Sequence, residues 1–167
     1  CPTDTSPYDP CERMCSRAAS TLSASGSRPW TRKPSPARNA AVSLYAFCRL
    51  ADDAIDDSDD PGLALQLLHQ RVEAIYSGTP QDFSADRALA PVVRQYGIPR
   101  ALIDALLEGF AWDCEGRLYP DLPALRQYAA RVAGTVGVMM ALLMGRRDPG
   151  ILARAADLGV AMQLTNI

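Results

Sequence analysis

Apolar and polar positions repeat with the period of an α-helix over most of the chain. Proline and glycine interrupt this period at intervals, as they do where helices end. No segment alternates with the period of two that is typical of a half-buried β-strand. The pattern predicts an all-α bundle of six helices, at about 37–57, 62–77, 85–96, 99–115, 122–144 and 149–167.

Two of these helices begin with the same pair of residues. Asp60 precedes Pro61, and Asp148 precedes Pro149. An aspartate side chain can accept hydrogen bonds from the free N–H groups of the first turn, and proline fits that turn because it needs no donor. We therefore predict that both aspartates are N-caps.

The first 38 residues do not share this pattern. They hold six of the 13 prolines, together with seven serines, and their apolar residues have no period. Such composition favours irregular structure. The sequence thus predicts an irregular Pro/Ser-rich arm at 1–38, followed by a helical domain at 39–167.

The 167 residues, of which 48% are hydrophobic, are enough to bury a core. The last apolar-periodic segment continues to Ile167 without a capping glycine, so we expect a C-terminally truncated bundle, the front portion of a larger domain. The formal net charge of −2 makes nucleic acid an unfavourable partner.

The location of the protein is predicted from its apolar stretches and its cysteines. The longest uncharged apolar stretch, residues 132–144, is shorter than the roughly 20 residues that span a bilayer. The five cysteines match neither a disulfide framework nor a metal motif, which favours a reducing compartment. We expect a cytoplasmic protein, and contact with the inner face of a membrane stays open.

The segment 43–57 carries the strongest candidate chemistry. At about 100° per residue, four of its polar side chains fall within a stripe about 60° wide. Most other directions around this helix are apolar, which is typical of a buried helix. The stripe is therefore expected to face an interior polar cleft, and it consists of Tyr45, Arg49, Asp52 and Asp56.

Two carboxylates on successive turns repel each other, and Arg49 can neutralise only part of their charge. Because the nearby donors are oxygens without histidine or cysteine, the pair favours Mg²⁺, with Mn²⁺ as an alternative. Mg²⁺ usually completes its shell with water and phosphate oxygens, and Arg49 suits a phosphate. The stripe predicts a metal-bridged diphosphate site. The alternative is a helix that simply ends in solvated aspartates, as Asp57, Asp59 and Asp60 are expected to do.

Two further helices hold weaker candidates. Tyr128, Val132 and Val136 follow one another at intervals of four, beside small residues that allow close approach of a backbone or a long apolar ligand. This face is either ordinary helix packing or a wall for a hydrocarbon chain. In the last helix, Gln163 and Asn166 share one face and could complete a metal or phosphate shell or bond within the core.

Four stretches, in order, resemble the signatures of the squalene and phytoene synthase family, most closely its bacterial phytoene synthases. The first is the aspartate-rich stretch 44–56. The others are residues 108–113 with Gly116-Arg117, Tyr128 with residues 132–137, and residues 158–167. The resemblance covers about residues 38–167. The family's second aspartate-rich motif, which normally follows the stretch 158–167, is absent from this chain.

The resemblance implies an isoprenoid synthase fold and a prenyltransferase that condenses two geranylgeranyl diphosphates head-to-head to phytoene without NADPH. By position, Asp52, Asp56 and Arg49 would be catalytic. The metal ligands would be Asp52, Asp56 and Asn166. The substrate would contact Tyr45, Arg49, Tyr128, Val132, Val136 and Gln163. Two alternatives stay open, a squalene or hydroxysqualene synthase that uses farnesyl diphosphate, and a non-catalytic assembly or scaffold protein. Activity of the truncated chain by itself is not expected.

Overall fold

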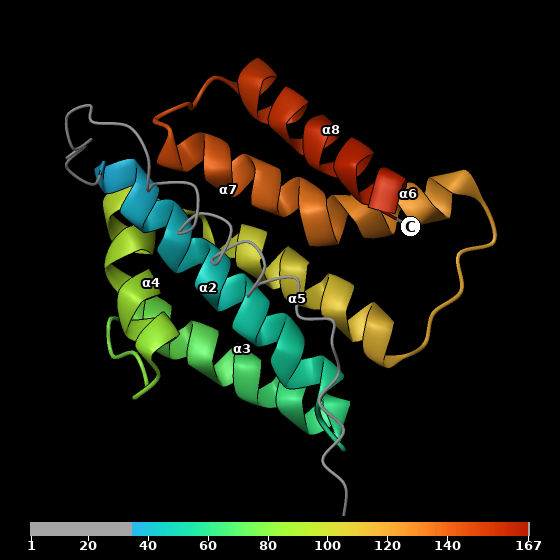
Figure 1. Ribbon diagram of the computed structural model, residues 1–167, viewed down its shortest axis with the longest axis horizontal. Coiled ribbons are helices and arrows are strands. Elements are labelled where there is room, and N and C mark those ends of the chain that lie inside the picture. Colours follow the sequence, from blue (N-terminus) through green and yellow to red (C-terminus); the bar gives the residue numbers. More distant parts are fainter. Residues whose placement is uncertain (1–34, 167) are drawn as a thin grey trace, which may run out of the picture. The chain divides into compact units, whose positions relative to one another are not determined.

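The computed structural model describes residues 35–166, and within that range all regular structure is helical (Figure 1). The predicted arm at 1–38 lies almost wholly outside the described residues. The predicted helices are confirmed, each within about two residues. The helices are α2 (Pro36–Asp56), α3 (Pro61–Ser77), α4 (Ser84–Tyr96), α5 (Arg100–Cys114), α6 (Leu122–Ala129), η1 (Ala130–Gly134), α7 (Thr135–Leu143) and α8 (Pro149–Asn166).

Both predicted N-caps are confirmed. The backbone N–H of Leu63 donates to Oδ1 of Asp60 at 2.9 Å, and that of Ile151 donates to Oδ1 of Asp148 at 3.0 Å. At the other end of α3, Gly78 adopts a left-handed conformation with φ of 85°, which is favourable for a residue without Cβ. Local sequence therefore determines where these helices begin and end.

The core lies between α2, α3, α4 and α5. Helix α2 packs against α3 and α4, and α5 packs against α3 and α7 and lies between α2 and α7 in Figure 1. Each of these helices contributes fully buried side chains, including Phe47 of α2, Leu68 of α3, Leu89 of α4 and Leu107 of α5. This core buries one side of α2 and leaves another side, which includes Tyr45, largely exposed.

The long predicted helix at 122–144 is found at 122–143, with a π-helical segment, η1, in its middle. A π-segment inserts one residue into an α-helix and is frequent at functional sites. The hydroxyl of Thr135 donates to the carbonyl of Arg131 at 2.6 Å at the end of this segment. The helical period alone did not predict the insertion.

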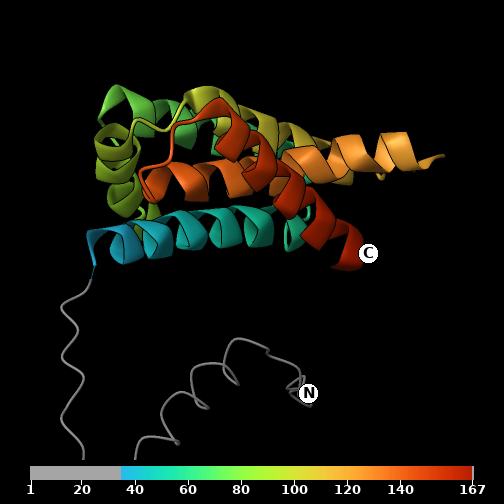
Figure 2. The same ribbon diagram turned by 90° about the horizontal axis from the view of Figure 1, so that it is seen from above.

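Helix α8 packs against η1 and α7 at very short range (Figure 2). A Cβ atom at Gly137 would collide with the carbonyl oxygen of Ala155, and one at Gly159 with that of Ala133. The small residues thus allow two backbones to approach, which is the packing alternative considered above. The opposite side of α8 is open, and Leu158 and Met162 are 64% and 59% exposed.

Between residues 35 and 166, no helix combines the length and the apolar character that crossing a membrane requires.

Candidate active site

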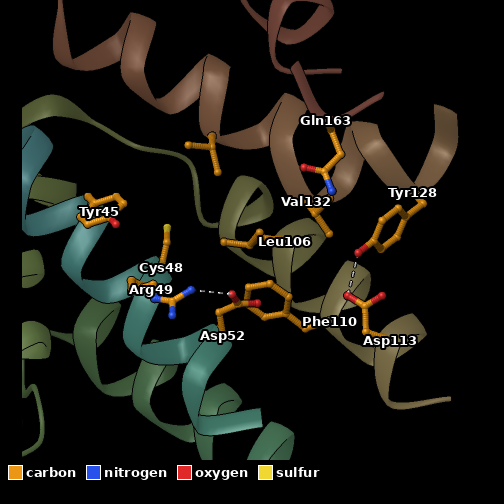
Figure 3. A pocket seen from close by; sticks show the side chains of 11 residues that line it. Tyr45, Cys48, Arg49, Asp52, Leu106, Phe110, Asp113, Tyr128, Val132 and Gln163 are labelled. Carbon is orange, nitrogen blue, oxygen red and sulfur yellow. Dashed lines mark hydrogen bonds and ion pairs between the residues drawn. The ribbon is translucent and has the colours of Figure 1, made fainter. Parts of the chain in front are cut away.

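A pocket of about 320 Å³ opens beside α2, where α5, α6, η1, α7 and α8 also contribute side chains (Figure 3). Its polar groups come from α2, α5, α6 and α8, and its apolar wall comes mainly from α5 and the helix at 122–143. The lining residues are Tyr45, Cys48, Arg49, Asp52, Leu106, Phe110, Asp113, Tyr128, Val132, Val136 and Gln163.

Seven of the nine predicted site residues meet in this pocket, although they come from five elements, α2, α6, η1, α7 and α8. They are Tyr45, Arg49, Asp52, Tyr128, Val132, Val136 and Gln163. Asp56 and Asn166 are exposed and are not among the residues that line it. The tertiary structure therefore brings most of the candidates together, while the role of each remains a prediction.

The expected burial of the stripe on α2 is wrong. Tyr45 is 65% exposed, and the side chains of Arg49 and Asp52 are 60% and 43% exposed. Helical periodicity shows which residues share a face, but whether another helix covers that face depends on distant parts of the chain. Three of the four stripe residues, Tyr45, Arg49 and Asp52, line an open pocket.

Arg49 divides its charge between two aspartates. Its Nη2 lies 2.9 Å from Oδ1 of Asp53, and its Nη1 lies 3.7 Å from Oδ2 of Asp52. Asp53 is thus the nearer partner of Arg49. Asp52 receives only a weak share of the positive charge.

The carboxyl of Asp52 shows that negative charge is incompletely balanced here. Partial burial and the neighbouring charge of Asp56 raise its pKa above the ordinary value, against the opposing effect of Arg49. The charge of Asp113, on α5, also raises the pKa of Asp52. A site that disfavours its own negative charge gains from a cation, and oxygen-only donors suit Mg²⁺.

The chain by itself offers few ligands for that cation. Among residues 35–166, no three histidine, cysteine, aspartate or glutamate side chains lie close enough to hold a metal ion. Mg²⁺ usually takes one or two protein carboxylates and completes its octahedron with water and phosphate oxygens. The donors present therefore fit a metal that arrives with a phosphate-bearing ligand rather than a preformed metal cage.

Four residues of the lining are not among the predicted site residues, and of these four only Asp113 is a carboxylate. It lies near the end of α5, and its Oδ2 accepts a hydrogen bond from the hydroxyl of Tyr128 at 3.0 Å. Leu106, Phe110 and Asp113 follow at intervals of four and three, so they share a helix face that the periodicity could have indicated. What the sequence does not show is that this face turns toward α2.

A second, apolar pocket continues from the first along α2. It has a volume of about 430 Å³ and shares Tyr45, Cys48 and Val136 with the polar pocket. Its remaining lining comes from the first turns of α2 and from α7, at Arg38, Ala41, Val42, Leu44 and Met140. The two pockets together offer a charged end and an apolar extension.

Cys48 lies where the two pockets meet. Burial and the charge of Asp52 raise the pKa of its thiol to about 12, so that almost none of it is thiolate at neutral pH. A thiol needs the thiolate form to act as a nucleophile. Cys48 therefore serves as an apolar wall residue.

Comparison with known proteins identifies the family of this chain. Residues 32–167 match the model of the squalene/phytoene synthase family. The chain is 51% identical over 137 residues to the phytoene synthase of Rhodobacter capsulatus, covering 80% of this chain and 40% of that protein. It is 49% identical over 144 residues to the phytoene synthase of Cereibacter sphaeroides, with 80% and 41% covered.

Comparison with solved structures supports the same family. A crystal structure of a dehydrosqualene synthase in complex with a ligand superimposes with a TM-score of 0.70 and 32% sequence identity, covering 78% of this chain and 46% of that one. The chain thus spans less than half the length of these relatives. Because the family model covers the whole described structure, the chain belongs to the squalene/phytoene synthase family.

Proposed function

We propose that the protein is a phytoene synthase-type prenyltransferase, which joins two geranylgeranyl diphosphates head-to-head and releases two diphosphates and two protons. The observation that carries this proposal is that a polar and an apolar pocket adjoin and share Tyr45, Cys48 and Val136. A half-neutralised carboxylate, Asp52, lies at one end, and an apolar channel continues along α2 and α7 from there. The 51% identity to a phytoene synthase supports the same assignment.

The polar end would hold the diphosphate. Asp52 and Asp56 would bind Mg²⁺, with Asn166 as a further ligand, while Arg49, Tyr45 and Gln163 contact phosphate oxygens. When bound, the metal supplies positive charge that helps a diphosphate leave its allylic carbon. The bidentate geometry of a guanidinium suits phosphate oxygens, which explains an arginine rather than a lysine at position 49.

The apolar walls would hold the hydrocarbon and the cation that ionisation leaves. Leu106, Val132 and Val136 exclude water that would otherwise capture such a cation. The rings of Phe110 and Tyr128 line the same pocket and offer electron-rich faces that attract positive charge. The reaction transfers no hydride, so NADPH is not part of this proposal.

A second candidate is a synthase that acts on farnesyl diphosphate. It is favoured by the likeness to the dehydrosqualene synthase structure, which has 32% sequence identity. Both candidates use the same charged end and differ in the length of the tail. A non-catalytic scaffold is disfavoured because Asp52 and Asp56 repel each other and serve no packing purpose.

To test the proposal, the protein encoded by the complete reading frame is incubated with Mg²⁺ and either geranylgeranyl or farnesyl diphosphate, and the hydrocarbon products are identified by mass spectrometry. We expect phytoene from the C20 substrate, and no product when the metal is chelated. A C30 product from farnesyl diphosphate alone would favour the second candidate. Folded protein that converts neither substrate would exclude both.

The proposal includes peripheral contact with the inner face of a membrane in the cytoplasm, because the substrate tail and the hydrocarbon product are both apolar. Co-sedimentation with vesicles of neutral and anionic phospholipid tests this part separately. Protein that stays in the supernatant with both kinds of vesicle would contradict it.

A further inference from the structure

One hydrogen bond in the pocket involves no residue of α2. The hydroxyl of Tyr128 donates to Oδ2 of Asp113 at 3.0 Å, joining the end of α6 to the end of α5 (Figure 3). Both residues line the polar pocket, on the side opposite Asp52. The proposed function uses Tyr128 as part of the wall but gives Asp113 no task.

The packing of these helices does not depend on this hydrogen bond. One turn before Asp113, the carboxylate of Glu108 lies 2.9 Å from Nη2 of Arg131. Gly109 brings the backbone of α5 so close to η1 that an added Cβ would lie 2.6 Å from Val132. These two contacts already hold α5 against η1, so Asp113 is left free for another purpose.

The ring of Tyr128 is fixed independently as well. Tyr119, from the loop between α5 and α6, stacks on it with ring centroids 4.9 Å apart and planes inclined by 30°. Stacking sets the position of the ring but not the direction of its hydroxyl hydrogen. That direction is set by Asp113, because a carboxylate near a phenol is the stronger acceptor.

The direction of this hydrogen decides whether the Tyr128 hydroxyl offers a hydrogen or lone pairs to a ligand in the pocket. A tyrosine hydroxyl has one hydrogen and two lone pairs. With its hydrogen committed to Asp113, the oxygen of Tyr128 can offer other groups only lone pairs, and the phenol cannot act as a donor to a diphosphate. Burial and the hydrogen bond to Asp113 also raise the pKa of Tyr128, which keeps the phenol neutral.

We propose that Asp113 is a positioning residue: by accepting the hydroxyl hydrogen of Tyr128, it holds that side chain as a neutral, electron-rich wall for the allylic cation. This inference rests on the proposed function for the identity of the cation, and on the structure alone for the hydrogen bond. Without Asp113, the hydroxyl is free to turn and to donate to an oxygen of the departing diphosphate.

Kinetics of variants test the proposal. Asn at position 113 keeps a carbonyl acceptor for this hydroxyl but removes its charge, and a neutral hydrogen bond is typically about 10-fold weaker than one to a charged group. Asp113→Asn is therefore expected to lower kcat by about that factor, with little change in KM. Tyr128→Phe should lower kcat at least as much, and the double variant should be no worse than Tyr128→Phe, because both act through one hydroxyl. Losses that multiply in the double variant, or a raised KM with unchanged kcat, would overturn the proposal.

Two matched controls come from the remote part of the same core. Asp104 lies on α5 and pairs with Arg100, and the hydroxyl of Tyr76 donates to the carbonyl of Ile98 at 3.1 Å. Asp104→Asn and Tyr76→Phe make the same chemical changes away from the pocket, and we expect both to keep the wild-type kcat. A similar loss of kcat in these controls would show that the effect is structural and would overturn the inference.

A readout that needs no turnover separates the two proposals. In protein labelled with ¹³C at the tyrosine Cζ atoms, the Tyr128 resonance is identified by its absence in Tyr128→Phe. We expect Asp113→Asn to shift that resonance at neutral pH, and Asp104→Asn to leave it in place. A shift in protein that converts no isoprenoid diphosphate would support the hydrogen bond and reject the proposed function. An unmoved resonance in active protein would reject the positioning role and leave the proposed function standing.

Discussion

Two different arginine–aspartate groups lie on the two sides of helix α2. On the core side, Arg71 of α3 bonds Asp86 of α4 through two nitrogens, at 2.9 and 2.7 Å. Asp86 is 0% exposed, and the guanidinium lies 5.9 Å from the ring centroid of Phe47 on α2. On the pocket side, Arg49 reaches Asp53 closely and Asp52 only at 3.7 Å, and all three are partly exposed.

The difference lies in how completely each charge is matched. A buried ion pair is tolerable only when its partners satisfy each other, and the paired geometry of Arg71 and Asp86 does so. The pocket side has more carboxylate than guanidinium groups, and its exposure to solvent lowers the energetic cost of this excess negative charge. The matched pair can serve the fold, whereas the unmatched aspartates remain available to a metal and a diphosphate.

The sharpest test of this comparison is to break the matched pair. Asp86→Ala leaves a buried guanidinium without a partner, and breaking a buried pair in this way typically costs about 3–5 kcal/mol. We expect a loss of that size in the free energy of unfolding, measured by urea denaturation. The double variant Arg71→Met with Asp86→Leu should lose much less, because it leaves no unpaired charge. An equally large loss there would mean that packing, not charge, is decisive.

On the pocket side, Asp52→Asn should spare the fold and impair function. Changes near a bound metal typically cost about 10- to 100-fold in affinity or activity, and loss of a ligand should cost at least that. We expect Mg²⁺-dependent turnover of the complete protein to fall at least about 100-fold, while the melting temperature stays equal or rises. Asp57→Asn, at the exposed end of the same helix, serves as the control with unchanged turnover. Retained turnover in Asp52→Asn would remove Asp52 from the metal site.

The raised pKa of Asp52 predicts a pH effect of opposite sign to the usual one. The folded state holds this proton more tightly than the unfolded chain, where an aspartate titrates near about 3.9. Stability therefore rises as pH falls through the folded pKa toward the unfolded one. When the pH is lowered from 7 to about 4, the melting temperature of the wild type should rise relative to that of Asp52→Asn. A wild-type melting temperature that falls relative to that of the variant as the pH is lowered would contradict the raised pKa of Asp52.

The smallest effect is expected for the exposed pair on the pocket side. Asp53→Asn removes the nearer partner of Arg49, and exposed ion pairs are typically worth about 0–1 kcal/mol. We expect a change in the free energy of unfolding within that range, and weaker still at high salt. A loss as large as that of Asp86→Ala would show that the two sides of α2 do not differ as described.

Much of the fold could be predicted from the sequence because its signals are local. Helical period, proline and glycine determined the helices, and an aspartate before a proline determined two N-caps. The same period placed Tyr45, Arg49 and Asp52 on one stripe, since residues three, four and seven apart share a face whatever surrounds the helix. The interrupted helix at 122–143 was predicted as one element, but its π-segment was not.

Other features depend on groups that are distant along the chain. Arg71 and Asp86 lie 15 residues apart and meet only because α3 and α4 pack together. Asp113 reaches Tyr128 only because Gly109 allows α5 to approach η1. The exposure of the stripe on α2 also depends on which helices cover it. The sequence by itself determined the helices and the composition of each face, and the tertiary structure alone decided which faces meet, because burial and pairing are properties of neighbours that no local period contains.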